Sequence, residues 1–213
     1  MSNSPLYQPP AGLELVYVDE HIAVANKASG LLTVPGRGED KADCLQSRVT
    51  AALGLALVVH RLDMSTSGLV IFARHSDAQS KLARAFQERK VEKQYDAIVE
   101  GIVTEDEGTV DLPLRCDWPN RPRQMVCYEW GKPAITRYKV VERGAKVTQV
   151  HLFPVTGRSH QLRVHMQAIG HPILGDELYG DPTLADSLCL HARSLRFDHP
   201  ATGESIALQC NRH

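Results

Sequence analysis

The sequence predicts an α+β fold in which strands dominate. Short alternating or apolar segments recur along the 213 residues, whereas only three stretches carry helical signals. Hydrophobic residues make up 43% and charged residues 23%, as in ordinary globular proteins. A chain of this length buries enough surface to fold without disulfides or metals. We therefore expect one domain over residues 13–213 after a flexible tail of residues 1–12.

The first elements are expected to be a hairpin and a helix. Leu13–Asp19 and His21–Asn26 alternate or run apolar, which predicts two paired strands. A segment rich in glycine, proline and charge then leads to Asp43, whose side chain is expected to cap a helix ending near Leu53.

Two further helices are predicted from capping signals. Ser76 with Gln79 three residues later is a capping-box pattern for a helix to about Arg89. Ser159 is expected to cap a helix that ends at Gly170. The remaining elements are expected to be strands, at Leu57–His60, Gly68–Ala73, Glu92–Val99, several short segments between Thr109 and Val155, Leu188–Phe197 and Ser205–Leu208.

The charge balance argues against a protein that grips nucleic acid indiscriminately. Lys plus Arg number 24 and Asp plus Glu number 25, which leaves a net charge of −1. Basic residues nevertheless outnumber acidic ones over residues 115–146. This segment is compatible with a selective polyanion partner, and solvated charges on ordinary strands remain an equally open interpretation.

Other features indicate an intracellular protein without a metal. No apolar run is long enough to cross a bilayer, and the N-terminus lacks the features of a signal peptide. The five cysteines form no CxxC pair, which favours reduced thiols in the cytoplasm. His160 and His165 are five residues apart, not the four of an HExxH helix, so no metal site is expected.

The densest group of reactive side chains lies at residues 60–68, HRLDMSTSG, between two apolar strands. In an extended loop Arg61 and Asp63 point the same way. A neighbouring cation keeps a carboxylate ionised, which suits a nucleophile or a base. A structural ion pair is the alternative. Ser65 or Ser67 is disfavoured as a nucleophile because the GxSxG context is missing.

Two other segments are candidates on weaker grounds. On the helix predicted after Ser159, one face is apolar and Arg163 lies on another, polar face. An amphipathic surface helix is the slightly favoured interpretation of this segment taken alone. Tyr95 lies in a predicted strand, where a tyrosine is usually part of the core.

Taken together, these segments resemble the RluA family of RNA pseudouridine synthases. HRLDMSTSG resembles the family signature HRLDxxTSG, and four other family motifs follow the family order. The likeness spans about residues 14–208. Ala28 replaces the usual proline of one motif, and no S4-type RNA-binding domain is expected. The other matching segments are Asn26–Gly30, Lys93–Gly101, Thr156–His165 and His191–Ala192.

The resemblance implies a mixed, bent β-sheet flanked by helices and loops, with a central RNA-binding cleft. It also implies isomerisation of uridine to pseudouridine within RNA, without a cofactor. By resemblance Asp63 acts at the sugar, either attacking C1′ or removing a proton from C2′, and the choice stays open. Arg163 would keep Asp63 charged. Tyr95 would stack on the uracil and help to remove the C5 proton.

The implied partners are stem-loops of tRNA and 23S rRNA, because residues 111–129 resemble family members that act on both RNAs. Arg61 would occupy the position that the extruded base leaves, and a monomer is expected. Two rival functions are an RNA-binding module without catalysis and a hydrolase that uses Asp63. The expected RNA-binding residues are His60, Arg61, Arg121, Arg123, Arg158 and His160.

Overall fold

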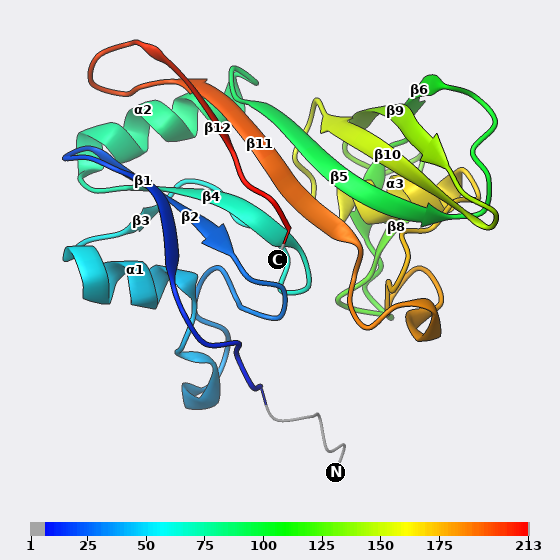
Figure 1. Cartoon of the computed structure of the whole chain (residues 1–213), viewed down its shortest axis with the longest axis horizontal. Coiled ribbons are helices and arrows are strands. Elements are labelled where there is room, and N and C mark those ends of the chain that lie inside the picture. The colour runs from blue at the N-terminus through cyan, green and yellow to red at the C-terminus, as the bar shows by residue number, and fades with distance from the viewer. Residues whose placement is uncertain (1–6, 213) are drawn as a thin grey trace. The chain divides into compact units, whose positions relative to one another are not determined.

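The computed structural model describes residues 7–212 and confirms the α+β class. The described chain folds into two compact units, each with its own strands and core (Figure 1). The first unit comprises the chain up to Val91 and from Leu195 onwards, and the second comprises Glu92–Ser194. Residues 1–6 of the predicted tail lie outside the described residues. Tyr7 is described, and its hydroxyl donates to the carbonyl oxygen of Asp43 at 3.1 Å.

The predicted hairpin is confirmed in the first unit. Its two strands pair antiparallel, and the second of them pairs antiparallel with the strand after the Asp63 loop. Leu195 and Phe197 pack into the same core. The strands are β1 (Glu14–Val18), β2 (Ile22–Lys27), β3 (Leu57–Val58), β4 (Ser67–Ala73), the end of β11 (Leu190–Asp198) and β12 (Ser205–Gln209).

Two predicted helix caps of this unit are wrong by one residue. Helix α1 (Leu45–Leu53) is capped by Cys44, whose sulfur accepts from the backbone N–H of Ser47 at 3.4 Å. Asp43 instead forms an ion pair with Arg48 at 2.7 Å. The arginine holds the pKa of the Asp43 carboxyl below its usual value.

Helix α2 (Ser76–Gln87) is capped by His75 rather than Ser76. The Nδ1 atom of His75 accepts from the N–H of Ala78 at 3.3 Å. Because Nδ1 accepts, Nε2 is the donor of this ring, and it lies 2.9 Å from Nδ1 of His21. The β1–β2 turn is thereby joined at His21 to the start of α2.

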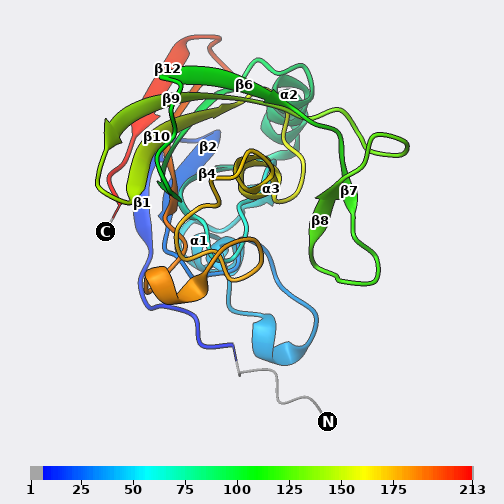
Figure 2. The same cartoon turned by 90° about the vertical axis from the view of Figure 1, so that its right-hand side faces the viewer.

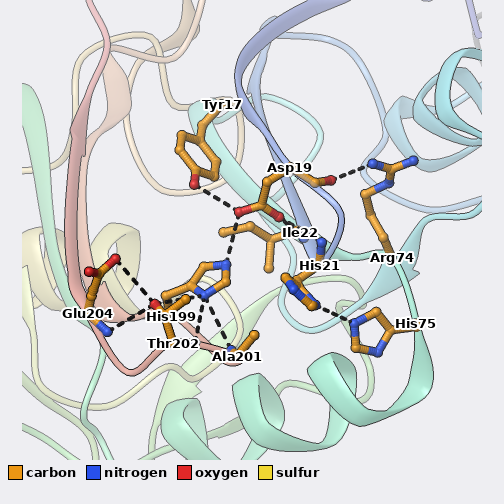
Figure 3. A network of polar contacts seen from close by, with 10 residues as sticks. All are labelled: Tyr17, Asp19, His21, Ile22, Arg74, His75, His199, Ala201, Thr202 and Glu204. Carbon is orange, nitrogen blue, oxygen red and sulfur yellow. Dashed lines mark hydrogen bonds and ion pairs between the residues drawn. The ribbon is translucent and has the colours of Figure 1, made fainter.

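A second contact fixes the same turn to the turn before β12 (Figure 3). The Asp19 carboxylate accepts from the Tyr17 hydroxyl at 2.8 Å, from the N–H groups of His21 and Ile22 and from Nε2 of His199 at 2.9 Å. Burial raises the pKa of Asp19, but these donated hydrogen bonds outweigh it and leave the pKa below its ordinary value.

The second unit is built on four strands in the order β5–β10–β9–β6, paired antiparallel. A separate two-stranded ribbon packs with α3 and includes β7 and β8. The elements of this unit are β5 (Glu92–Glu100), β6 (Glu107–Asp111), β7 (Leu114–Cys116), β8 (Gln124–Val126), β9 (Ile135–Arg143), β10 (Val147–Pro154) and α3 (Gln161–Ala168).

Helix α3 differs from its prediction in two ways. Ser159 is not the cap, because His160 occupies that position with a left-handed φ of 53° and no side-chain cap bond. The helix is also not an amphipathic surface helix, since every residue of Gln161–Met166 is buried. Its polar side chains therefore face protein, and each needs a partner there.

Two short 3₁₀ turns, Glu39–Lys41 and Pro182–Leu184, complete the described elements. In the described residues, no helix has the length and apolar character needed to span a membrane.

Candidate active site

The loop that carries Asp63 is fixed on both sides of the carboxylate. Thr33 donates its hydroxyl to the carbonyl of Leu62 at 2.8 Å and accepts from the N–H of the same residue at 3.2 Å. On the other side, Ser29 donates its hydroxyl to the carbonyl of Ser65 at 2.7 Å. The Asp63 side chain between these anchors is half-buried. Its backbone is thus positioned before any substrate arrives.

The side chain of Lys27 also binds this loop. Its side chain is completely buried, and Nζ donates to the carbonyl oxygens of Ala28 at 3.0 Å, Leu31 at 2.6 Å and Met64 at 2.9 Å. Burial lowers the pKa of Lys27 to about 7, and the charge of Asp63 opposes this shift. The three carbonyls match the three N–H donors of the ammonium form. The carbonyl oxygens and the charge of Asp63 thus favour the ammonium form of Lys27 against the cost of burial.

His60 and Arg61 begin this loop and have different surroundings. The Nε2 atom of His60 accepts from the N–H of Ile71 at 2.9 Å, and its ring stacks on Phe86 with the centroids 4.6 Å apart. These contacts give His60 a structural role. Arg61 is exposed, where a ligand can reach its guanidinium group.

In the second unit, Arg163 is buried and bound to a carboxylate. Its Nε and Nη2 atoms donate to the two oxygens of Asp176 at 2.7 and 2.6 Å. Asp176 is completely buried and also accepts from the N–H of Tyr179. Two parallel hydrogen bonds of this kind fix the plane of a guanidinium group. The orientation of Arg163 is therefore set by its own unit.

Three other residues of the segment Thr156–His165 hold the fold by hydrogen bonds. Gln161 accepts from the Thr156 hydroxyl at 2.7 Å and donates to the Thr136 oxygen at 3.0 Å. The buried ring of His165 lies between the Thr136 hydroxyl at 2.9 Å and the carbonyl of Leu112 at 3.0 Å. Burial lowers the pKa of His165, so the neutral ring holds α3 in place.

Three of the predicted site residues meet around Tyr179. The guanidinium carbons of Arg123 and Arg163 each lie 5.2 Å from its ring centroid. Its hydroxyl is 2.8 Å from Nδ1 of His160 and accepts from the N–H of Gln124 at 2.7 Å. Burial raises the pKa of Tyr179, which keeps the hydroxyl neutral. This cluster joins the β7–β8 ribbon to the loop before α3.

The other predicted residues of the second unit lie outside this cluster. Tyr95 is half-buried on β5, opposite Leu152, and packs against the core of the unit. Arg121 is exposed, as is Arg158, whose Nε donates to the carbonyl of Pro133 at 3.1 Å. In residues 7–212 no group of three or more His, Cys, Asp or Glu side chains is arranged to hold a metal ion.

Sequence reasoning missed the roles of Lys27, Asp176 and Tyr179. Lys27 belongs to one of the matching motifs, but nothing in the pattern indicates that its charge is buried beneath the Asp63 loop. Asp176 lies 13 residues after Arg163 in a loop segment, and no periodicity connects the two. An Asp and a Tyr three residues apart after a helix are a weak signal for a turn that closes on that helix.

Comparison with known proteins identifies the family. The family model described as RNA pseudouridylate synthase matches residues 21–168. A protein of Vibrio cholerae called dual-specificity RNA pseudouridine synthase RluA is 53% identical over 199 residues, covering 91% of this chain and 81% of its own. Proteins with the same name from Pasteurella multocida and Escherichia coli K12 are 52% and 53% identical, and the matches cover 94% and 95% of both chains.

Solved structures agree with these sequence matches. Human RNA pseudouridylate synthase domain containing 1 superposes with a TM-score of 0.78 at 30% identity, covering 99% of this chain and 86% of that one. Human RNA pseudouridylate synthase domain containing 4 superposes with a TM-score of 0.74 at 26% identity, covering 94% and 88%. By sequence and by fold, this chain belongs to the RluA family of RNA pseudouridine synthases.

Proposed function

We propose that this enzyme isomerises specific uridines to pseudouridine in stem-loops of both tRNA and 23S rRNA. The family membership supports the reaction, and the printed name of its bacterial relatives, dual-specificity RNA pseudouridine synthase, supports more than one RNA substrate. Likeness to these relatives extends over nearly the whole chain, which favours a shared substrate class.

The reaction exchanges one glycosidic bond for another within the same nucleotide. The N1–C1′ bond of uridine breaks, the uracil rotates, and C5 bonds to C1′. N1 ends with a proton, and the proton on C5 leaves to a base and then to solvent. No electrons are gained or lost, and no cofactor is needed.

The main observation behind this assignment is that the loop of Asp63 is fixed by hydrogen bonds, one of which comes from the buried Lys27. A carboxylate is needed near the sugar, and the bonds of Thr33, Ser29 and Lys27 hold the backbone that carries it. In the proposal Asp63 either attacks C1′ or removes the C2′ proton. In either route a preorganised anion lowers the cost of reaching the transition state.

Arg163 and Tyr95 complete the proposed catalytic group. The role of Arg163 as the cation that keeps Asp63 ionised follows from the family resemblance, and within its own unit the bonds to Asp176 fix the guanidinium plane. Tyr95 stacks on the uracil and its hydroxyl assists removal of the C5 proton. A half-buried ring on a strand suits this role because it is rigid and still accessible.

The remaining proposed contacts are with RNA. A base inside a helix must leave its stack before reaction, at a cost of a few kcal/mol. Arg61, which is exposed, fills the vacated position, and Arg121 and Arg158 contact phosphates. Arg123 and His160 support these contacts by holding the Tyr179 cluster together. His60 supports the loop that carries Asp63.

The proposal includes the cytoplasm as the compartment and a monomer as the active form. All five cysteines are free thiols in the structure, which fits a reducing compartment.

Product analysis tests the reaction directly. RNA labelled with tritium at C5 of uridine is incubated with the enzyme, and tritium release is measured on tRNA and 23S rRNA transcripts in parallel. We expect stoichiometric release from one defined uridine in each RNA. Release of free uracil would replace the proposal with a hydrolase, and RNA binding without tritium release would replace it with a binding module.

A further inference from the structure

Three aromatic side chains of the second unit are unusually exposed. The exposed fractions are 61% for Trp118, 79% for Tyr128 and 69% for Trp130. The sequence contains only two tryptophans, and both belong to this group. Aromatic side chains ordinarily bury most of their large area, so three such rings left in solvent within one short segment indicate a binding surface.

The segments that carry these rings adjoin the two ends of the β7–β8 ribbon, which Figure 2 shows. Next to Trp118, the N–H of Asp117 donates to the carbonyl of Arg123 at 3.0 Å. In the segment of Tyr128 and Trp130, the N–H of Gly131 donates to the carbonyl of Cys127 at 2.8 Å. A Cβ on Gly131 would lie only 2.2 Å from that oxygen, so this turn requires glycine.

The opposite face of the ribbon is already used by the fold. Leu114 and Val126, which pair across the ribbon, pack with Val164 and Tyr179 in a core cluster. The next pair, Arg115 and Met125, must point to the other face, because successive side chains of a strand alternate. The ribbon thus has one face that stabilises the unit and one that is available to a ligand.

Basic side chains occur in the same segment, and one of them lies against a ring of this group. The guanidinium carbon of Arg121 lies 4.5 Å from the Trp118 ring centroid. Residues 114–132 contain four basic side chains and two acidic ones. The basic residues are Arg115, Arg121, Arg123 and Lys132.

This combination matches the chemistry of single-stranded nucleic acid. Unpaired bases stack on aromatic rings, and their phosphates pair with neighbouring cations. A surface that binds another protein would instead have an apolar centre with few charged residues. Residues 114–132 carry a net positive charge, which complements a phosphate backbone.

We propose that Trp118, Tyr128 and Trp130 form a base-stacking surface for unpaired nucleotides that flank the uridine being isomerised. The proposal rests on the proposed function for its ligand, which is RNA. It assigns to this ribbon a share of the binding energy that comes from bases rather than from phosphates alone.

Tryptophan fluorescence tests the surface directly, because it contains both tryptophans. In the Asp63→Asn background, which prevents turnover, we expect quenching by a tRNA stem-loop and by single-stranded oligouridylate. Inorganic polyphosphate, which offers charge without bases, should not quench. Absence of quenching with saturating stem-loop would overturn the proposal.

Affinity measurements add an independent test. Trp118→Ala, Tyr128→Ala and Trp130→Ala should each weaken stem-loop binding about 5- to 150-fold, the range for loss of one base–aromatic stack. The Trp130→Phe variant should retain most of the affinity, because its ring still stacks. Val141→Ala, at an exposed position on β9, is the matched control and should bind like the wild type.

Failure of this inference is separable from failure of the proposed function. If the wild type releases tritium but the triple alanine variant binds with unchanged affinity, the stacking surface is wrong and the isomerase stands. If the triple variant loses affinity but the wild type releases no tritium, the surface stands and the proposed function is wrong.

Discussion

At the scale of single residues, the environment of Asp63 depends on a lysine that contacts no solvent. Lys27 fixes the backbone next to Asp63 through the carbonyl of Met64 and adds positive charge beneath the loop. Burying an ammonium group is unfavourable, and the lowered pKa of Lys27 reflects this cost.

The pH dependence of stability should reveal this cost. Below pH 7 the folded and unfolded chains both carry protonated Lys27, so the folded state bears the full cost of burying the charge. Between pH 7 and 10.5 the unfolded chain binds a proton that the folded chain lacks. The free energy of unfolding should therefore rise with pH over this window, by at most about 1.4 kcal/mol per unit from Lys27.

Urea unfolding of the wild type and of Lys27→Met at pH 7, 8 and 9 measures the effect. The stability difference between wild type and variant should shift in favour of the wild type as pH rises. A difference that stays constant with pH would show that Lys27 is not deprotonated in the folded protein.

Tyr95 permits a second test at the residue scale. Tyr95→Phe keeps the ring that we propose to stack on the uracil and removes only the hydroxyl. We expect RNA affinity within about twofold of the wild type and a slower single-turnover rate, since one acid–base group typically contributes about 100-fold or more. An unchanged single-turnover rate would reduce Tyr95 to a stacking residue.

The sequence predicts the residues that stand in motifs, but not the partners that hold them. Asp63 and Arg163 are recognisable because their neighbours in the chain form a pattern. Asp176 and the carbonyl of Met64 are partners brought together by the fold, and such contacts leave no local signal. The buried state of Arg163 was missed for the same reason, since helical periodicity alone predicts an exposed polar face.

At the scale of elements, the strands were better predicted than the helix starts. Alternating or continuous apolar residues identify β1, β2 and β4 closely, because each packs side chains against a core. The caps at Asp43 and Ser76 are wrong because several polar residues near each helix start can accept a backbone N–H, and the cap at Ser159 is wrong because α3 begins after His160 without a side-chain cap. Tertiary contacts decide among them, as the His21–His75 pair does at α2.

Two substitutions can test whether His75 or Ser76 caps α2. His75→Ala removes the acceptor for the Ala78 N–H and should destabilise the fold by about 1 kcal/mol. Ser76→Ala should have little effect, because Ser76 is already inside the helix. Urea denaturation measures both variants, and His21→Ala controls for the lost imidazole contact. Equal losses in His75→Ala and Ser76→Ala would contradict this cap assignment.

At the scale of the whole molecule, the net charge of −1 limits how RNA is held. Nonspecific attraction is weak in such a protein, so binding should fall only moderately with salt. Discrimination in RNA usually depends on unpaired loop bases. We therefore expect recognition to lie in the loop that contains the target uridine.

A minimal anticodon stem-loop should accordingly be modified nearly as well as the full-length tRNA. Pseudouridine is quantified in both RNAs at matched concentrations. Arg121→Ala should weaken both substrates alike, because a phosphate contact carries no sequence information. Arg123→Ala is less informative, since this side chain also packs on Tyr179. Reaction of the intact tRNA alone would place recognition outside the loop.

The most direct test of the catalytic assignment is single-turnover tritium release by Asp63→Asn. The replacement is nearly isosteric and removes only the anionic oxygen, while the bonds of Thr33, Ser29 and Lys27 to the loop remain. We expect folding and RNA affinity to be retained and tritium release to fall to background. Release at more than a few per cent of the wild-type rate would contradict the central role of Asp63.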